Sequence, residues 1–285
     1  MLPLFPSRRL RSLALPTVNR AEPMNLGLVY WGQQFALGRQ GVQFPDLLGL
    51  AHGTLTNGAY YNNSLRAPMQ GPGVTFDGTD DYIGLTPVGW PAVDAAKSLL
   101  CWFTYDGTAT RRILCSGVKD DSSTANNSYN LEVNSRTSLA VVRWGAWGGL
   151  IWGQLAIDQF TANTVICCLI CQPNPTAATL RGFLNGQEVT VLDNASRSQS
   201  GAIAVARVGS FNNAFPSPYH NRDVYSVQVW NRDMSDYAPA LYSDALQGSP
   251  RRLLQGLRAM AALPAAGGSS VPRFYHQRQQ QGMAS

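Results

Sequence analysis

Short strand-like segments recur along most of this 285-residue chain, and turn residues separate them. Apolar residues make up 45% of the sequence and charged residues only 14%, while glycine and proline number 27 and 17. This mixture is typical of many short strands joined by turns, and it disfavours long solvated helices. The candidate strands are residues 28–31, 73–76, 82–85, 98–105, 112–115, 129–133, 139–144, 164–171, 179–184, 188–191, 202–208 and 223–230. So many alternating segments predict an all-β, antiparallel two-sheet sandwich.

Two local patterns fix register within this sandwich. Asn185-Gly186 lies between two candidate strands, and this pair readily adopts the positive φ angles of a type I′ hairpin turn. In residues 223–230, Tyr225, Val227 and Val229 fall on one face, which we predict to be the core face.

One short C-terminal helix is predicted after the last strand. Ser235 is a suitable N-cap, residues 238–246 are compatible with a helix, and Pro239 is tolerated in the first turn. Gly248 is the expected end of the helix.

Charge divides the chain into a body and two arms. Residues 1–24 carry a net charge of +3, residues 248–285 carry +5 without any acidic residue, and the stretch between them carries −3. We therefore predict an extended basic N-terminal arm (1–24), a sandwich domain (25–247) and an extended basic C-terminal arm (248–285). Basic arms on a mildly acidic body indicate docking onto an acidic surface, and free solubilising tails are the alternative.

An acidic protein surface is favoured over nucleic acid as the partner of these arms. Dense basic charge interleaved with stacking aromatic residues is missing, and no run of five or six basic residues occurs. The residues predicted to bind the partner are Arg8, Arg9, Arg11, Arg251, Arg252, Arg273, Phe274 and Tyr275.

The five cysteines do not form a disulfide framework, because their number is odd and most lie in apolar runs. Cys168 and Cys171 match C-x-x-C, but no second pair or nearby histidine completes a zinc site. We predict buried thiols and a reducing compartment. The charge order of the first residues is the reverse of a signal peptide and no 18-residue apolar stretch occurs, so no membrane association is expected.

Residues 74–83 read Val-Thr-Phe-Asp-Gly-Thr-Asp-Asp-Tyr-Ile, and residues 45–58 contain a shortened Asp-Leu-x-Gly loop followed by Gly-Thr-Leu. This pair of segments resembles the opening of laminin-G/concanavalin A-like jelly-roll domains. The resemblance extends over about residues 26–247 and implies a jelly-roll sandwich. Residues 18–29 are similar to the lead-in of such domains in tailed-phage virion proteins, which implies a place in a virus particle.

The resemblance also implies calcium as a candidate ligand, because many relatives bind this ion through loop carboxylates. The available ligands are Asp46, Asp77, Asp80 and Asp81. The Asp46 loop lacks the asparagines that would supply amide oxygens. We therefore predict no cofactor and no metal, with calcium left as the open alternative and turn bracing as the other role of these aspartates.

No catalytic residues are predicted. Sandwich glycosidases need two closely spaced carboxylates, but none of Glu22, Glu132 and Glu188 has an acid two or four residues away. The three histidines lie in loops or in the tail, without a nucleophile motif. The chain is expected not to be an enzyme.

Trp144, Trp147 and Trp152 lie within nine residues, beside glycines. If exposed, they would form a carbohydrate-binding platform. If buried, they would be core or interface anchors, and burial is favoured.

From the basic arms and the resemblance, the predicted function is a non-catalytic virion protein, made in the host cytoplasm. It would decorate the capsid surface, oligomeric within the assembly, and clamp the major capsid protein or other virion subunits through its arms. The alternative is a carbohydrate-binding module of a phage fibre or adhesin.

Overall fold

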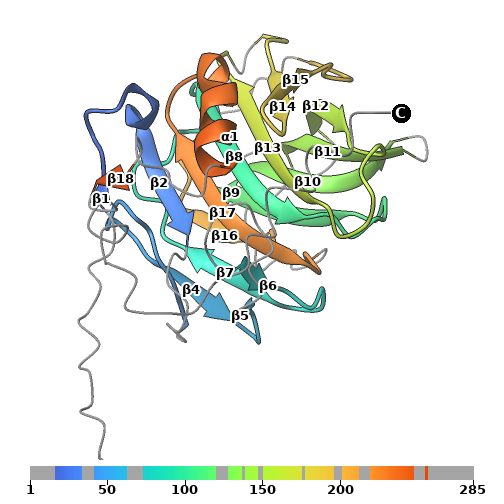
Figure 1. The fold of residues 1–285 in the computed structure, drawn as a ribbon, viewed down its shortest axis with the longest axis horizontal. Helices are drawn as coiled ribbons and strands as arrows, with labels where there is room; N and C mark the ends of the chain where they lie inside the picture. The colour runs from blue at the N-terminus through green and yellow to red at the C-terminus, as the bar shows by residue number, and fades with distance from the viewer. Residues whose placement is uncertain are drawn as a thin grey trace, which may run out of the picture.

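The computed structural model describes residues 17–33, 42–62, 73–119, 128–136, 139–146, 150–174, 177–195, 201–211, 219–246 and 254–255. Within these ranges, strands form two large antiparallel sheets that pack face to face, and one short helix lies near the C-terminal end (Figure 1). The predicted all-β antiparallel sandwich with a single short helix is confirmed.

The first sheet, here called the helix-covered sheet, has the strand order β15-β14-β13-β8-β17-β6-β5, and β2 also pairs with β17. Its strands are β2 (Leu28–Gln33), β5 (Tyr60–Asn62), β6 (Gly73–Thr75), β8 (Lys97–Thr104), β13 (Val165–Gln172), β14 (Arg181–Leu184), β15 (Gln187–Val189) and β17 (Asp223–Trp230).

The second sheet, here called the opposite sheet, has the order β12-β11-β10-β9-β16-β7-β4-β3. Its strands are β3 (Gln43–Phe44), β4 (Gly53–Thr56), β7 (Tyr82–Leu85), β9 (Arg112–Val118), β10 (Ser128–Arg136), β11 (Leu139–Ala146), β12 (Leu150–Ala156) and β16 (Val205–Val208). The sequence analysis did not predict β3, β4, β5 or β12.

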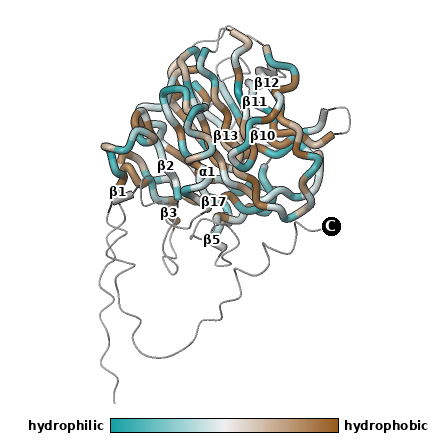
Figure 2. Tube along the Cα trace, turned by 45° about the horizontal axis from the view of Figure 1, so that its top comes forward, coloured by the Kyte–Doolittle hydropathy of each residue, from teal (hydrophilic) through white to brown (hydrophobic). Residues whose placement is uncertain are grey.

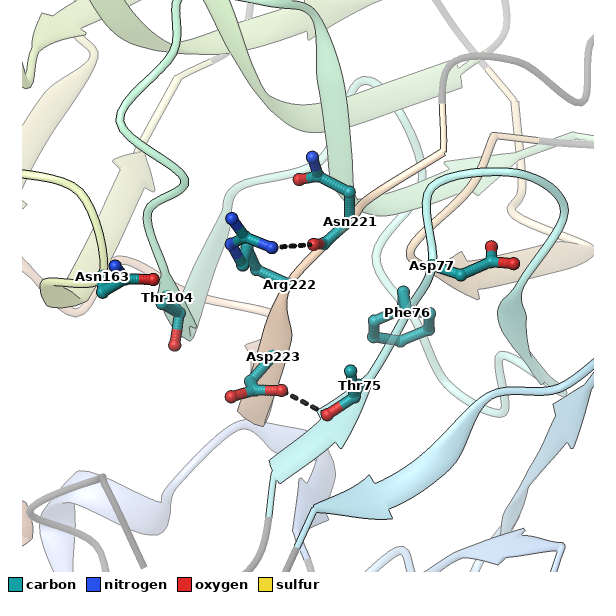
Figure 3. Close-up of a pocket in the computed structure, with 8 residues that line it drawn as sticks. All are labelled: Thr75, Phe76, Asp77, Thr104, Asn163, Asn221, Arg222 and Asp223. Atoms are coloured by element: carbon teal, nitrogen blue, oxygen red, sulfur yellow. Dashed lines mark hydrogen bonds between the residues drawn. The ribbon is translucent and has the colours of Figure 1, made fainter. Parts of the chain in front are cut away.

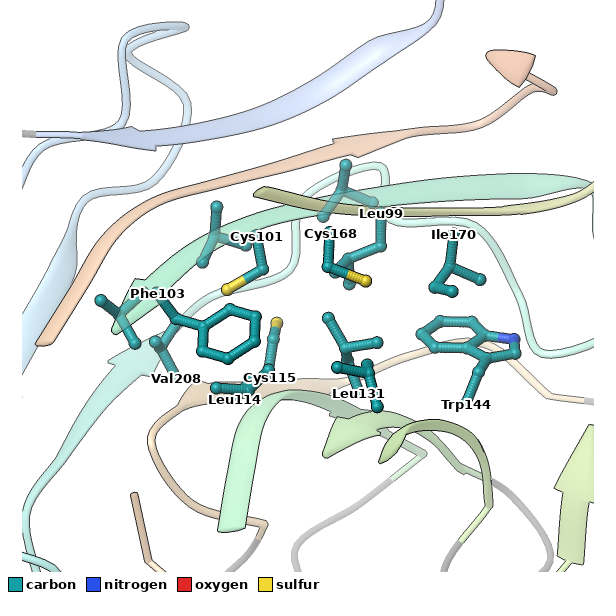
Figure 4. Packing of buried hydrophobic residues seen from close by; sticks show 14 of the residues in the cluster. Leu99, Cys101, Phe103, Leu114, Cys115, Leu131, Trp144, Cys168, Ile170 and Val208 are labelled. Atoms are coloured by element: carbon teal, nitrogen blue, oxygen red, sulfur yellow. The ribbon is translucent and has the colours of Figure 1, made fainter. Parts of the chain in front are cut away.

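The main core lies between the two sheets. Alternate residues of β8, among them Leu99, Cys101 and Phe103, point inward and meet side chains such as Cys115 and Leu131 of the opposite sheet (Figure 4). Each large apolar side chain removed from water contributes about 1.5–3 kcal/mol, so this double layer supplies most of the driving force for folding. Hydrophobic segments accordingly follow the strands along the chain (Figure 2).

A second apolar cluster covers the outer face of the helix-covered sheet. It is formed by outward residues of β8, β13 and β17 together with the helix α1 (Ala238–Leu246) and the segment before β2. Trp102 stacks on Tyr242 of α1 at a centroid distance of 5.6 Å, and the Trp230 indole N–H donates to the Met24 carbonyl at 2.9 Å. All eight residues of β8 and all eight of β17 are buried as a result.

A β-bulge changes the facing of β17. Val227 and Val229 lie in the main core as predicted, but Tyr225 lies in the outer cluster with Trp230. The register of β17 against β8 shifts between Val224 and Ser226, which turns Tyr225 outward. The prediction that Tyr225 shares the core face is therefore wrong.

The predicted hairpin and helix are present. Asn185 and Gly186 have φ angles of 51° and 79° between β14 and β15, as a type I′ turn requires. The helix begins with the 3₁₀ turn η2 (Ser235–Tyr237), where the Asp233 carboxylate accepts bonds from the Ser235 backbone N–H and hydroxyl, both at 3.0 Å. Met234 occupies the N-cap position without a side-chain cap, so the prediction of Ser235 as N-cap is wrong. Gly248 lies outside the described residues.

The two ends of the body meet in a small two-stranded sheet. β1 (Thr17–Val18) pairs antiparallel with β18 (Leu254–Gln255), and the 3₁₀ turn η1 (Pro23–Asn25) follows β1 (Figure 1). Val18 and Met24, which the sequence analysis placed in the N-terminal arm, are buried in the outer cluster. Within the described residues, no helix is long and apolar enough to cross a membrane.

All five cysteines are free and buried, as predicted. Cys168 lies in the main core and Cys171 in the outer cluster, because residues three apart on a strand point to opposite faces. The C-x-x-C pair therefore cannot hold one metal ion. Burial raises the pKa of the Cys115 and Cys171 thiols to about 12, which removes the reactive thiolate at neutral pH.

We therefore expect the native protein to be inert toward a thiol-specific aromatic disulfide reagent at pH 8. Absorbance of the released thiolate should stay near baseline and rise to five equivalents per chain after unfolding in guanidinium. Rapid reaction of even one thiol in the native protein would contradict the burial of these side chains.

Candidate functional site

A polar pocket of about 420 Å³ opens beside the ends of β6, β8 and β17. It is lined by Thr75, Phe76, Asp77, Thr104, Asn163, Asn221, Arg222 and Asp223 (Figure 3). Carboxylate, amide, guanidinium and hydroxyl groups thus converge from three strands and the loop before β13. Such a set provides both donors and acceptors for a polar ligand.

Asp223 organises the floor of the pocket. Its carboxylate accepts a hydrogen bond from the Thr75 hydroxyl and another from the Tyr225 hydroxyl at 3.2 Å. The Tyr225 and Thr104 hydroxyl oxygens are 3.1 Å apart, within hydrogen-bond distance. The bulge that turns Tyr225 outward therefore also supplies the phenol that holds Asp223 in place.

An exposed aromatic ring adjoins this pocket. Tyr60 on the edge strand β5 is the register partner of Thr75 on β6, and Thr75 in turn is the partner of Asp223 on β17. Directly opposed residues present their side chains on the same face, so these three form a row across the outer face of the sheet. Tyr60 remains 59% exposed. The sequence analysis missed this tyrosine because a three-residue strand is too short to show a period.

His220 lies beneath the pocket, with its ring edge-on to Phe76 at 6.0 Å and to Phe103 at 6.4 Å. Neither ring nitrogen has a hydrogen-bond partner within the described part of the chain. Burial lowers the pKa of His220 to about 4, although Asp106 and Asp223 oppose that shift. The ring is therefore neutral at physiological pH. His220 lies in a loop, as predicted, but its ring is buried because it packs against Phe76 and Phe103 of the main core.

The four aspartates that are available as metal ligands separate into two groups. Asp46 is buried, and its carboxylate accepts bonds from four backbone N–H groups, those of Trp31, Leu48, Leu50 and Ala51, at 3.0–3.2 Å. These donors occupy both oxygens, so Asp46 braces its turn and does not fit a metal. Asp77, Asp80 and Asp81 lie together, with one carboxylate oxygen from each within 4.8 Å of the others.

Of the three candidate tryptophans, the structure describes the side chain of Trp144. Trp144 is buried in the main core, and its indole N–H donates to the Gln172 side chain at 3.1 Å. Trp144 therefore cannot stack on a sugar, as the burial hypothesis predicts. Trp147 and the side chain of Trp152 lie outside the described residues. So do the predicted partner-binding residues Arg8, Arg9, Arg11, Arg251, Arg252, Arg273, Phe274 and Tyr275.

Glu132 is the most buried of the described glutamates, and neighbouring side chains hold its carboxylate in place. Glu132 on β10 accepts bonds from Arg111 and Asn130 on one oxygen and from Asn134 and Arg143 on the other. Glu188 lies on β15 in the other sheet and pairs with Arg181 at 2.8 Å. The described glutamates therefore do not form a facing pair of carboxylates.

The buried neutral state of His220 predicts acid sensitivity. Its pKa is about 4 in the folded protein and near 6.5 when unfolded, so the unfolded state binds the proton more readily. Stability contributed by the neutral ring is complete above pH 6.5 and is lost as the pH falls toward 4, by about 3 kcal/mol.

In His220→Phe, whose ring suits the contacts with Phe76 and Phe103, this loss should disappear. Urea unfolding of both proteins at pH 7 and pH 4.5 measures it, and other titrating groups cancel in the comparison. Equal pH profiles for the two proteins would rule out a neutral buried His220.

Comparison with protein-family models and with curated protein sequences finds no match. Solved structures do match the fold. The chain is similar to Trypanosoma rangeli sialidase in complex with sialic acid, with a TM-score of 0.55, 13% identity and coverage of 79% of this chain and 34% of the sialidase. It is also similar to the receptor-binding domain of botulinum neurotoxin D, with a TM-score of 0.55, 10% identity and coverage of 77% and 53%.

The chain thus spans about a third to a half of the length of these proteins. At such identities the likeness shows the fold alone. It defines the class of this protein as a β-sandwich domain of the kind found in those larger proteins.

Proposed function

We propose that this protein is a non-catalytic glycan-binding module, and that the pocket beside Tyr60 is its binding site. The observation that carries the proposal is the exposed Tyr60 ring in one row with Thr75 and Asp223. Sugar rings present an apolar face and a fringe of hydroxyls, so an exposed aromatic ring next to a polar pocket matches both.

The charge of the pocket indicates the class of glycan. Asp77 and Asp223 provide two carboxylates, and Arg222 provides one guanidinium. The net charge of −1 disfavours acidic sugars and favours neutral ones, whose hydroxyls pair with carboxylates and amides. Thr104 and Asn163 add a hydroxyl and an amide at the same side of the pocket (Figure 3).

The structural neighbours support glycan binding in general and do not bear on the preference for neutral sugars. The sialidase was solved with sialic acid, and the toxin domain is a receptor-binding domain. Those activities belong to the whole proteins, and this chain shares only the sandwich with them. The proposal therefore depends on the pocket and not on the likeness.

A glycan array followed by calorimetric titration tests the site. Tyr60→Ala and Arg222→Ala should each weaken binding of the best neutral glycan by about tenfold, equivalent to about 1.4 kcal/mol. Tyr60→Phe retains the ring and should bind nearly as the original protein does.

Arg20→Ala removes an exposed arginine far from the pocket residues in sequence and serves as the charge control. Unchanged affinity in both pocket variants, or a preference for sialylated over neutral glycans, would refute this assignment.

As a second candidate, we propose that the arms attach the module to a virus particle, as a capsid decoration or minor capsid protein. The supporting observation is the pairing of β1 with β18, which fixes the attachment points of both arms side by side. Residues 1–16 and 256–285 each contain three arginines and no acidic residue. Six positive charges attached at one place on the body favour a single acidic docking surface.

Co-sedimentation with particles of the virus that encodes the chain tests this attachment. The full chain should co-sediment at low salt and lose affinity as salt rises, and a form lacking residues 1–16 and 256–285 should remain in the supernatant. The same truncated form should retain its glycan affinity, which shows that it is folded. Undiminished particle binding by the truncated form would exclude the arms as the anchor.

A further inference from the structure

The chain contains two Asn-Gly pairs, Asn57-Gly58 and Asn185-Gly186. Both asparagines adopt positive φ angles, 64° at Asn57 and 51° at Asn185. An asparagine followed by glycine is chemically labile, because glycine lacks a Cβ and its backbone nitrogen can approach the side-chain carbonyl carbon of the asparagine. The folded surroundings of each pair therefore decide which of the two reacts.

The Asn185-Gly186 turn is held firmly. It closes the β14–β15 hairpin, and the two residues that flank it are register partners in the ladder. The Asn185 backbone N–H donates to the Cys167 carbonyl at 2.8 Å, and the Asn185 side-chain oxygen accepts a bond from the Cys167 N–H at 2.9 Å. A Cβ added to Gly186 would lie 2.8 Å from the Tyr242 Cβ. The helix α1 therefore leaves this turn no room to rearrange.

The Asn57-Gly58 turn is held less tightly. It joins β4 of the opposite sheet to β5 of the helix-covered sheet, and strands in different sheets do not form the ladder that closes a hairpin (Figure 1). Asn57 and Gly58 are both exposed, and the backbone bond across the turn, from Ala59 to Thr56, is long at 3.4 Å. Asn57 Nδ2 donates to the Asp80 carbonyl at 3.1 Å, which holds the amide nitrogen and leaves the backbone of the turn free to rotate.

We propose that Asn57 is a site of spontaneous deamidation in the folded protein, and that Asn185 is protected from the same reaction. The Gly58 backbone nitrogen attacks the side-chain carbonyl carbon of Asn57. The bond from that carbon to Nδ2 breaks, and ammonia leaves with the proton that the Gly58 nitrogen has lost. Water then opens the resulting succinimide at one of its two carbonyl carbons, which gives aspartate or isoaspartate. The reaction consumes water alone and requires no oxidant or reductant.

The reactive turn lies between two parts of the proposed glycan site, so its effect on binding rests on the proposed function. Tyr60 follows Gly58 by two residues, and Asp80 belongs to the loop that begins at the pocket residue Asp77. The hydrogen bond from Asn57 to the Asp80 carbonyl connects these two parts. A carboxylate in place of the amide is an acceptor only and cannot make this bond.

The new carboxylate also arises beside existing negative charge. The carboxylates of Asp77, Asp80 and Asp81 lie together, and a Cβ added to Gly58 would lie 3.1 Å from Asp81 Oδ1. Like charges repel one another, so the turn is driven away from this loop. Isoaspartate adds a methylene group to the backbone and shifts the strand that carries Tyr60. Deamidation therefore weakens glycan binding as the protein ages.

Peptide mapping by mass spectrometry, during incubation of the full chain in mildly alkaline buffer, tests the modification site. In the native protein, conversion at Asn57 should be at least about tenfold faster than at Asn185. In guanidinium, where both turns are lost, the two pairs should convert at similar rates because the dipeptide is the same. Equal rates in the native protein, or a native Asn57 that stays intact while the unfolded chain reacts, would overturn the proposal.

Glycan titration of fresh and aged protein tests the coupling. Affinity should fall several-fold as Asn57 converts, and Asn57→Asp should show such a loss without ageing. Asn185→Asp makes the same change of charge in the protected turn and should bind as the original protein does. Asn57→Gly accepts the positive φ angle and cannot deamidate, so ageing should not change its affinity.

The possible failures separate this proposal from the proposed function. Conversion at Asn57 with undiminished glycan affinity overturns the coupling and leaves the modification site standing. If the fresh protein binds no glycan, the proposed function is wrong, and peptide mapping still decides whether Asn57 deamidates.

Discussion

Burial of β8 on both faces is the constraint on which the rest of the structure depends. Its inward side chains require the opposite sheet, and its outward Leu100 and Trp102 require a second cover. The helix α1 and the segment leading into β2 provide that cover, which brings the two ends of the body together at the β1–β18 pair. The β1 and β18 segments are therefore brought together by the need to shield one strand.

The same constraint explains where the pocket lies. The outer apolar cluster ends at Tyr225 on this side of the sheet. The hydroxyl oxygens of Tyr225 and Thr104 lie 3.1 Å apart there. Beyond them the face continues with Asp223, Thr75 and Tyr60, which the helix does not cover. A polar hydrogen-bonded boundary thus separates the shielded part of the sheet from the part that meets solvent. The ring of Tyr60 is exposed because β5 is an edge strand beyond that boundary.

The sequence patterns correctly predicted those features of the fold that depend on neighbouring residues in the chain. Most strands, the Asn185-Gly186 turn and the buried cysteines followed from alternation, positive-φ preference and apolar context. Tyr225 was misplaced because alternation assumes a regular strand and cannot reveal a bulge. Tyr60 was missed for a different reason: its strand has three residues, too few for a period, and its exposure is decided by its place at the sheet edge.

Asp46 and Asp81 show why residue type and motif did not settle the metal question. Both are buried carboxylates in loops that lead from one strand to the next. The turn after Asp46 directs four backbone N–H groups at its oxygens, so its charge is fully solvated by the chain itself. At Asp81 the Asp77 backbone N–H donates to Oδ2, the Ala59 backbone also favours the charged form, and two further carboxylates lie nearby. The supply of backbone donors, which is a property of the folded loop, therefore decides how firmly each aspartate is held in its turn.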